Sequence, residues 1–217
     1  MVKLYQSAAA LCLVAGLVGC GPAEISAPIG EEAAVVQSVP ALPVSDYALI
    51  DAASRLSFVS IKAGDIVETH RFDRISGDVS GDGTGRLVVD LASVNTAVDI
   101  RNERMREVFF ETATYPEAII TTSINPSTFE ALAIGERVEQ ELEASLSLHG
   151  VELPMYTTIA VTRLDETTVS VDSTAPVPVA AADFDLAAGI ETLREMAGLD
   201  GITPASLVTF SLVYEAI

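Results

Sequence analysis

The sequence predicts an all-β domain, because its longest patterned segments alternate apolar and polar residues with a period of two. In the clearest of them, 138–149, one face carries only Val, Gln, Leu and Ala, and the other carries Glu, Ser and His. Such a strand is typical of an antiparallel sheet or barrel. Segments 86–92 and 207–216 alternate in the same way, and a glycine-rich turn at 80–85 precedes the first. Short strands joined by short turns indicate a closed barrel or a sandwich, and composition does not choose between them.

The remaining elements are less regular. Residues 155–164 and 168–175 are expected to pair as a hairpin. One helix is expected near 186–199, where apolar residues recur at helical spacing. A short helical connector is expected at about 100–109, which contains good helix formers and neither Gly nor Pro. Three further strands are expected at 54–62, 66–79 and 118–124.

The N-terminus has the features of an exported chain. Residues 1–19 are expected to be a signal peptide, because Lys3 precedes an apolar core too short to span a bilayer stably. The core ends in Leu-Val-Gly before Cys20, which resembles a bacterial lipobox and implies cleavage before Cys20 and lipid attachment to its sulfur. Ordinary cleavage nearby and an uncleaved anchor are the alternatives. Residues 20–45 then form a lipidated, flexible tether, and 46–217 form the domain.

The charge balance excludes several classes of partner. The chain has 12 Lys and Arg against 31 Asp and Glu, a formal net charge of −19. Loss of residues 1–19 removes only Lys3 from this count, which leaves a formal charge of −20. This argues against nucleic acid binding and against docking on anionic lipids through a basic patch. Cys12 lies in the signal core and Cys20 is the acylation site, so no disulfide is expected.

The sequence lacks the usual marks of catalysis and metal binding. It has no Gly-x-Ser-x-Gly motif, and no thiol remains in the mature domain to act as a nucleophile. His70 and His149 are the only histidines. We expect His149 to be a solvated turn residue, and no second ligand lies at metal spacing from His70. The sequence therefore predicts no enzyme activity, no metal site and no cofactor.

The densest run of charge and aromatic side chains, 99–118, carries a family resemblance. It contains Phe109 with Phe110 and Tyr115 with Pro116. Together with segments 54–58 and 146–154, these pairs resemble the motifs of the YceI-like family, in the same order, over 46–217. The resemblance implies an extended antiparallel lipocalin-like β-barrel with a short helical connector. It also implies that an isoprenoid or similar long apolar lipid binds in the barrel interior.

Three functions follow as hypotheses. The first is an envelope lipoprotein that carries or stores such a lipid, and the second is an envelope scaffold lipoprotein with a filled barrel core. The third, an enzyme acting on a lipidic substrate, has the least support. The residues expected to line a ligand, each of which can also be ordinary core, are Phe58, Phe109, Phe110, Tyr115, Leu142, Leu146, Phe184, Phe210 and Tyr214.

The expected location is the bacterial cell envelope. The expected partners are the lipid ligand and a membrane, reached through the N-terminal lipid anchor, and the sequence leaves monomer and homodimer both open. Gly21 and Pro22 follow Cys20, without an acidic residue. By analogy with bacterial lipoprotein sorting, this favours a periplasm-facing lipoprotein of the outer membrane.

Overall fold

A computed structural model describes residues 40–217 of the chain. The expected signal peptide, the lipid attachment site at Cys20 and most of the expected tether lie outside the described residues.

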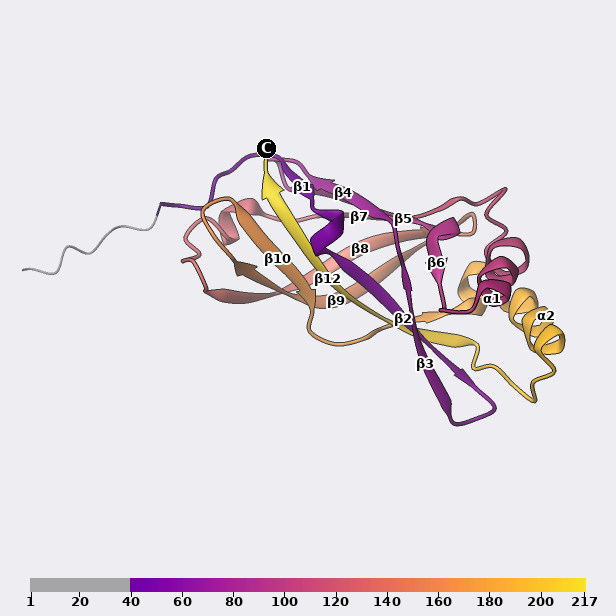
Figure 1. Ribbon diagram of the computed structural model, residues 1–217. Helices are drawn as coiled ribbons and strands as arrows, with labels where there is room; N and C mark the ends of the chain where they lie inside the picture. The colour runs from indigo at the N-terminus through magenta and orange to yellow at the C-terminus, as the bar shows by residue number, and fades with distance from the viewer. Residues whose placement is uncertain (1–39) are drawn as a thin grey trace, which may run out of the picture. The chain divides into compact units, whose positions relative to one another are not determined.

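The described part is built mainly from antiparallel strands (Figure 1). The strands are β1 (Tyr47–Leu49), β2 (Arg55–Lys62), β3 (Ile66–Phe72), β4 (Ile75–Val79), β5 (Thr84–Asp90), β6 (Val94–Asn95), β7 (Glu117–Ser123), β8 (Arg137–Leu148), β9 (Val151–Arg163), β10 (Thr168–Ser173), β11 (Val177–Ala180) and β12 (Ala205–Ala216). The α-helices are α1 (Asp99–Arg104), which continues as a π-helical turn (Met105–Phe109), and α2 (Ala187–Ala197). Short 3₁₀ turns lie at Asp51–Ala53, Leu91–Ser93, Pro126–Thr128 and Ala181–Phe184.

The strands close into an eight-stranded antiparallel barrel in the order β1-β4-β5-β7-β8-β9-β10-β12. Closure occurs at β1, where Tyr47 pairs with Val79 of β4 on one side and with Ala216 of β12 on the other. Closing the sheet on itself removes exposed strand edges. The barrel expectation is therefore confirmed, and the sandwich alternative does not apply.

The last strand, β12, has different neighbours along its length. Its C-terminal part pairs with β1 and β10, and its N-terminal part pairs with β2 and β11. The β2–β3 hairpin therefore extends the barrel wall toward the end that carries α1 and α2 (Figure 1).

The alternating segment predicted at 138–149 is confirmed as β8, which pairs with β9 over twelve positions. Ala144, Leu146 and Leu148 are buried, whereas the glutamates of the other face are exposed. The alternation arises because successive side chains of a strand point to opposite faces.

The prediction for His149, in the turn after β8, is wrong. His149 is not a solvated turn residue, because only 12% of its side chain is exposed. Its Nδ1 lies 3.2 Å from the main-chain oxygen of Phe184, and its Nε2 lies 3.1 Å from Oε2 of Glu111. The Tyr115 ring packs against it at a centroid distance of 4.3 Å, and a Cβ on Gly150 would lie 3.0 Å from that ring. The turn thus fastens the β8–β9 hairpin to the segment after α1.

Several boundaries differ from the sequence expectation. The segment expected as one strand at 66–79 is two strands, β3 and β4, because the chain changes neighbours at Asp73 and Arg74. Strand β9 begins at Val151 rather than at 155. The short strands β1, β6 and β11 were not expected.

Helices α1 and α2, with the π-helical turn, lie side by side at one end of the barrel, called here the helical end (Figure 1). Their close approach depends on Gly189, since a Cβ there would lie 3.2 Å from Cδ2 of Phe109 and 3.3 Å from the main-chain oxygen of Val108. Arg104 adds a hydrogen bond from Nη1 to the main-chain oxygen of Met196 at 3.3 Å.

Candidate functional site

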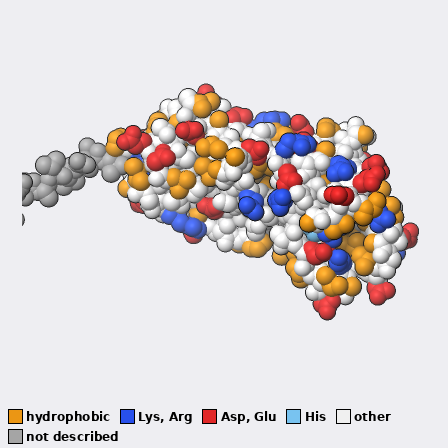
Figure 2. Space-filling view, in the orientation of Figure 1, with side chains coloured by type: hydrophobic (Ala, Val, Ile, Leu, Met, Phe, Trp, Pro, Cys, Tyr) orange, Lys and Arg blue, Asp and Glu red, His pale blue; other side chains and the backbone are white. Residues whose placement is uncertain are grey.

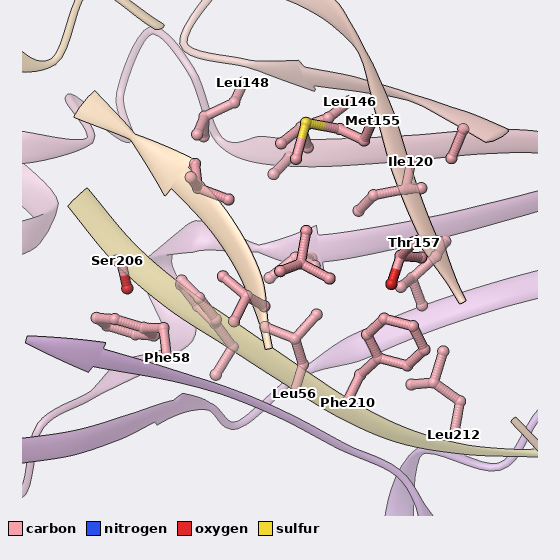
Figure 3. A pocket seen from close by; sticks show the side chains of 18 of the residues that line it. Leu56, Phe58, Ile120, Leu146, Leu148, Met155, Thr157, Ser206, Phe210 and Leu212 are labelled. Carbon is pink, nitrogen blue, oxygen red and sulfur yellow. The ribbon is translucent and has the colours of Figure 1, made fainter. Parts of the chain in front are cut away.

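The barrel interior holds a cavity of about 840 Å³ lined mainly by aliphatic and aromatic side chains. Figure 3 shows these side chains converging on one space from β2, β7, β8, β9 and β12. The labelled residues are Leu56, Phe58, Ile120, Leu146, Leu148, Met155, Thr157, Ser206, Phe210 and Leu212. The interior is therefore hollow, which does not match the filled core of the scaffold hypothesis.

The cavity runs along the barrel from one end to the other. Its lining includes Val44 at one end and Val98, Ile100 and Met196 at the helical end, all of them at least 43% exposed. The 12 residues of β8 cover about 40 Å, or about 30 Å along the axis of a barrel with strands tilted by about 40°. Because the lining residues reach both ends of the barrel, the cavity suits one extended chain of about that length.

Seven of the nine expected lining residues border this cavity. They are Phe58, Phe109, Phe110, Leu142, Leu146, Phe210 and Tyr214. Tyr115 and Phe184 do not border it. Tyr115 packs on His149, and Phe184 is 1% exposed in the core, where its main-chain oxygen lies 3.2 Å from Nδ1 of His149. That a ligand contacts the seven residues stays a prediction.

A row of aromatic rings connects the barrel wall with the helical end. Ring centroids lie 5.3 Å apart between Phe58 and Phe72, 5.8 Å between Phe72 and Phe110, and 4.8 Å between Phe110 and Phe109. These separations fall in the range in which tilted aromatic pairs attract one another. The row gives the helical end of the cavity a rigid apolar wall.

A group of polar side chains interrupts the apolar lining at the helical end and is called here the polar cluster: Ser60, Lys62, Glu68, His70 and Arg101. Oε2 of Glu68 accepts from Nζ of Lys62 at 2.8 Å and from Nη1 of Arg101 at 2.7 Å. Nη2 of Arg101 donates to the main-chain oxygen of Thr96 at 2.7 Å. Oγ of Ser60 lies 2.8 Å from Nε2 of His70.

Burial and neighbouring charges set the ionisation of this cluster. His70 is only 5% exposed, so desolvation, with a further contribution from nearby Arg101, lowers its pKa below 6.5. The hydrogen bond from Lys62, together with Arg101, lowers the pKa of Glu68. Near neutral pH the cluster therefore contains two cations, one carboxylate and a neutral imidazole. Farther along the cavity, burial raises the pKa of Tyr214 to about 12, so that its hydroxyl stays neutral.

The polar cluster was not predicted from the sequence. The available indication was the period of β2, which places Ser60 and Lys62 on the same face as Leu56 and Phe58. The partners come from elsewhere, because Glu68 lies on β3 and Arg101 on α1, 33 residues away in sequence.

The pairing of Ser60 with His70 has the spacing of a nucleophile and a base, which the sequence did not reveal. In a catalytic triad a third group orients the base. Within residues 40–217, Nδ1 of His70 has no hydrogen-bond partner, and Glu68 is engaged by Lys62 and Arg101. The pair therefore lacks the third member of a triad in the described part of the chain.

The surface shows where this end of the cavity meets solvent. Figure 2 shows hydrophobic side chains gathered toward the end that carries α1, α2 and the β2–β3 hairpin. The large exposed apolar side chains there are Ile66, Val67, Val98, Ile100, Met196 and Leu207.

In the described residues no three His, Cys, Asp or Glu side chains are grouped to hold a metal ion. Neither of the described α-helices is long and apolar enough for a transmembrane span.

Comparisons with known proteins match this architecture. A polyisoprenoid-binding domain from Saccharophagus degradans, described as implicated in plant cell wall breakdown, is 46% identical, with a TM-score of 0.77. The match covers 79% of this chain and 98% of that one. Burkholderia cenocepacia BcnA shares the fold at 19% identity and a TM-score of 0.59, over 76% of this chain and 98% of its own. Among curated proteins no match was found. The model of the YceI-like domain matches residues 47–213, so the chain belongs to the YceI-like family.

Proposed function

We propose that this protein binds one long apolar lipid of the polyisoprenoid type in its barrel cavity and carries or stores it. The observation that supports this most is the apolar cavity of about 840 Å³ that reaches exposed side chains at both ends of the barrel. Ligand pockets in proteins usually measure about 300–1,000 Å³. A chain in this cavity gains affinity from burial of apolar area, which is not directional, so length and width select the ligand.

The comparison with the Saccharophagus degradans domain supports the ligand class. That domain is described as binding polyisoprenoids and is 46% identical to this chain. An isoprenoid chain is apolar along its length, as most of the cavity lining is, and close packing of such surfaces gains dispersion energy.

The proposed role is binding rather than hydrolysis. The Ser60–His70 pair lacks an orienting carboxylate in the described residues, so the imidazole is not held as a general base. The setting is proposed from the sequence alone: a lipid on Cys20 would hold the protein at the periplasmic face of the bacterial envelope, with the outer membrane favoured.

Mass spectrometry of an organic extract of the purified protein tests the proposal. We expect one intact polyisoprenoid-type lipid per protein molecule, and the same stoichiometry after a lipid-free preparation is incubated with a long prenol. Leu146→Trp should abolish uptake, because it fills the cavity with an indole ring, whereas Glu141→Trp, on the outer face of the same strand, should not. A folded wild type that neither contains nor takes up such a lipid would refute the proposal.

A further inference from the structure

Two polar atoms at the helical end of the cavity are buried without a partner. Within residues 40–217, neither Nδ1 of His70 nor Nε of Arg101 has a hydrogen-bond partner. Both residues line the cavity, and His70 is only 5% exposed. Buried polar atoms in folded proteins are nearly always paired, and an unpaired one lowers stability. Two such atoms beside one cavity indicate a place where a polar ligand group completes the hydrogen bonding.

The chemistry of these atoms defines the group that fits them. Nε of an arginine can only donate, so it requires an acceptor. Nη1 and Nη2 of Arg101 already donate, to Glu68 and to the main-chain oxygen of Thr96. Nδ1 of a neutral histidine donates when Nε2 accepts from Ser60. An oxygen with several lone pairs can accept from both atoms, as a phosphate or carboxylate does.

The local charge favours an anion. Lys62, Arg101 and Arg104 line this end of the cavity, and Glu68 is the acidic residue among the lining residues there. Three cations thus face one carboxylate in a chain with 12 basic and 31 acidic residues. The side chains of Lys62 and Arg101 are 26% and 27% exposed, so they lie where the cavity meets solvent.

The strand pattern places this group at the end of the apolar path. Along the inward face of β2, Leu56 and Phe58 are followed by Ser60 and Lys62. The change from apolar to polar along one strand gives the cavity a direction: a lipid tail lies among the barrel strands and its head lies at the helical end.

We propose that the polar cluster at the helical end is a head-group site for an anionic oxygen group, so that the protein prefers a prenyl phosphate to the prenyl alcohol of the same length. This inference rests on the proposed lipid-binding function. Arg101 is the principal donor, and His70 and Lys62 complete the site. A hydrogen bond to a charged group has a large enough effect for the preference to reach about tenfold or more.

The test compares three probes with lipid-free protein by displacement of a fluorescent lipid: geranylgeranyl phosphate, geranylgeraniol and inorganic phosphate. We expect the prenyl phosphate to bind at least tenfold more tightly than the alcohol, and inorganic phosphate to displace nothing. Arg101→Gln should lower the affinity for the prenyl phosphate much more than the affinity for the alcohol, so that the preference is lost. Arg71→Gln is the matched control, because it removes an exposed cation from β3 that does not line the cavity.

The outcomes separate the head-group site from lipid binding itself. Equal affinity for phosphate and alcohol in the wild type overturns the head-group site and leaves lipid binding intact, whereas failure to bind either lipid refutes lipid binding. Displacement by inorganic phosphate alone indicates a free-anion site and also overturns the inference. If Arg101→Gln lowers the melting temperature strongly, Lys62→Gln replaces it, with a smaller loss of the same preference expected.

Discussion

Arg163 donates a hydrogen bond from Nη1 to the main-chain oxygen of Leu132 at 2.9 Å, although Arg163 is only 1% exposed. The same guanidinium donates to the main-chain oxygens of Pro40 at 2.7 Å, Asp165 at 2.9 Å and Glu166 at 3.2 Å. A buried arginine is usually paired with a carboxylate. Here, within the described residues, the guanidinium instead donates to main-chain carbonyl groups of three separate segments and holds them together.

Loss of this guanidinium should destabilise the fold. Arg163→Met leaves four main-chain oxygens without their donor, and each buried unpaired group costs about 1–3 kcal/mol unless water reaches it. We expect the free energy of unfolding in urea to fall by about 3 kcal/mol or more. Arg55→Met, at an exposed position of β2, should change it by no more than about 0.5 kcal/mol. Similar losses for both variants would show that Arg163 has no special role.

The two faces of β8 should respond differently to truncation. Leu146→Ala should lower the free energy of unfolding by about 2–5 kcal/mol. The loss should lie near the lower end of this range, because one side of Leu146 already faces the cavity. Leu142 is only half-buried, so Leu142→Ala should lower the free energy of unfolding by less. Glu141→Ala should change the free energy of unfolding by no more than about 0.5 kcal/mol. Urea unfolding of the three variants measures this order, and a loss for Glu141→Ala as large as for Leu146→Ala would contradict the assigned register.

The contact between α2 and the π-helical turn should not tolerate a side chain at position 189. Gly189→Leu forces α2 away from Phe109 and Val108, and overpacking of this kind costs about 1–3 kcal/mol. Because both elements border the cavity, retention of a bound lipid should also fall. The control is Gly201→Leu, since a Cβ there meets nothing within 4 Å. An unchanged melting temperature and lipid content for Gly189→Leu would show that the helices separate freely.

The buried His70 should make stability depend on pH. Its pKa in the folded protein lies below the ordinary value of 6.5, mainly through burial and then through Arg101. The unfolded chain therefore takes up the proton more readily. The stability that neutral His70 contributes is fully present above pH 6.5. It is lost as the pH falls from 6.5 through the pKa of His70 in the folded protein. Glu68, which acts in the opposite direction, and Lys62 are the other charged groups that influence it.

The measurement is the free energy of unfolding at pH 7.5 and at pH 5 for the wild type and for His70→Gln. Because carboxylates elsewhere titrate in both proteins, the informative quantity is the difference between the two profiles. We expect the wild type to lose more stability than the variant over this interval. Parallel profiles would mean that His70 is as easily protonated in the folded chain as in the unfolded one.

The sequence predicted the elements whose pattern is local. Strand β8 was predicted closely because twelve consecutive residues alternate, and α2 because its apolar residues recur at helical spacing. The start of β9 was missed because Pro154 argues against a strand interior. The structure accommodates this proline because the first half of β9 pairs only with β8 among the described strands, so no ladder bond is lost on the other side.

The candidate site was only partly predictable, because it depends on register between distant segments. Phe109 and Phe110 were identified as lining residues from a local motif. Arg101 was expected near a helix, but its contact with Glu68 follows from the packing of α1 against the β2–β3 hairpin. Tyr115 belongs to the same motif and nevertheless turns to His149, which no periodicity indicates.

The pairing of Tyr47 with Ala216 also determines the order in which this chain can fold. β1 and β2 come early among the described strands and their partner β12 follows all the others, so the ring stays open until β12 has been synthesised. Contacts between residues this far apart form slowly, because a long loop must close before they contribute any stability. Until then the apolar inner faces are exposed to solvent and to other chains. A barrel that β12 has not yet closed is thus exposed to aggregation, and the closed cavity exists only once β12 has paired.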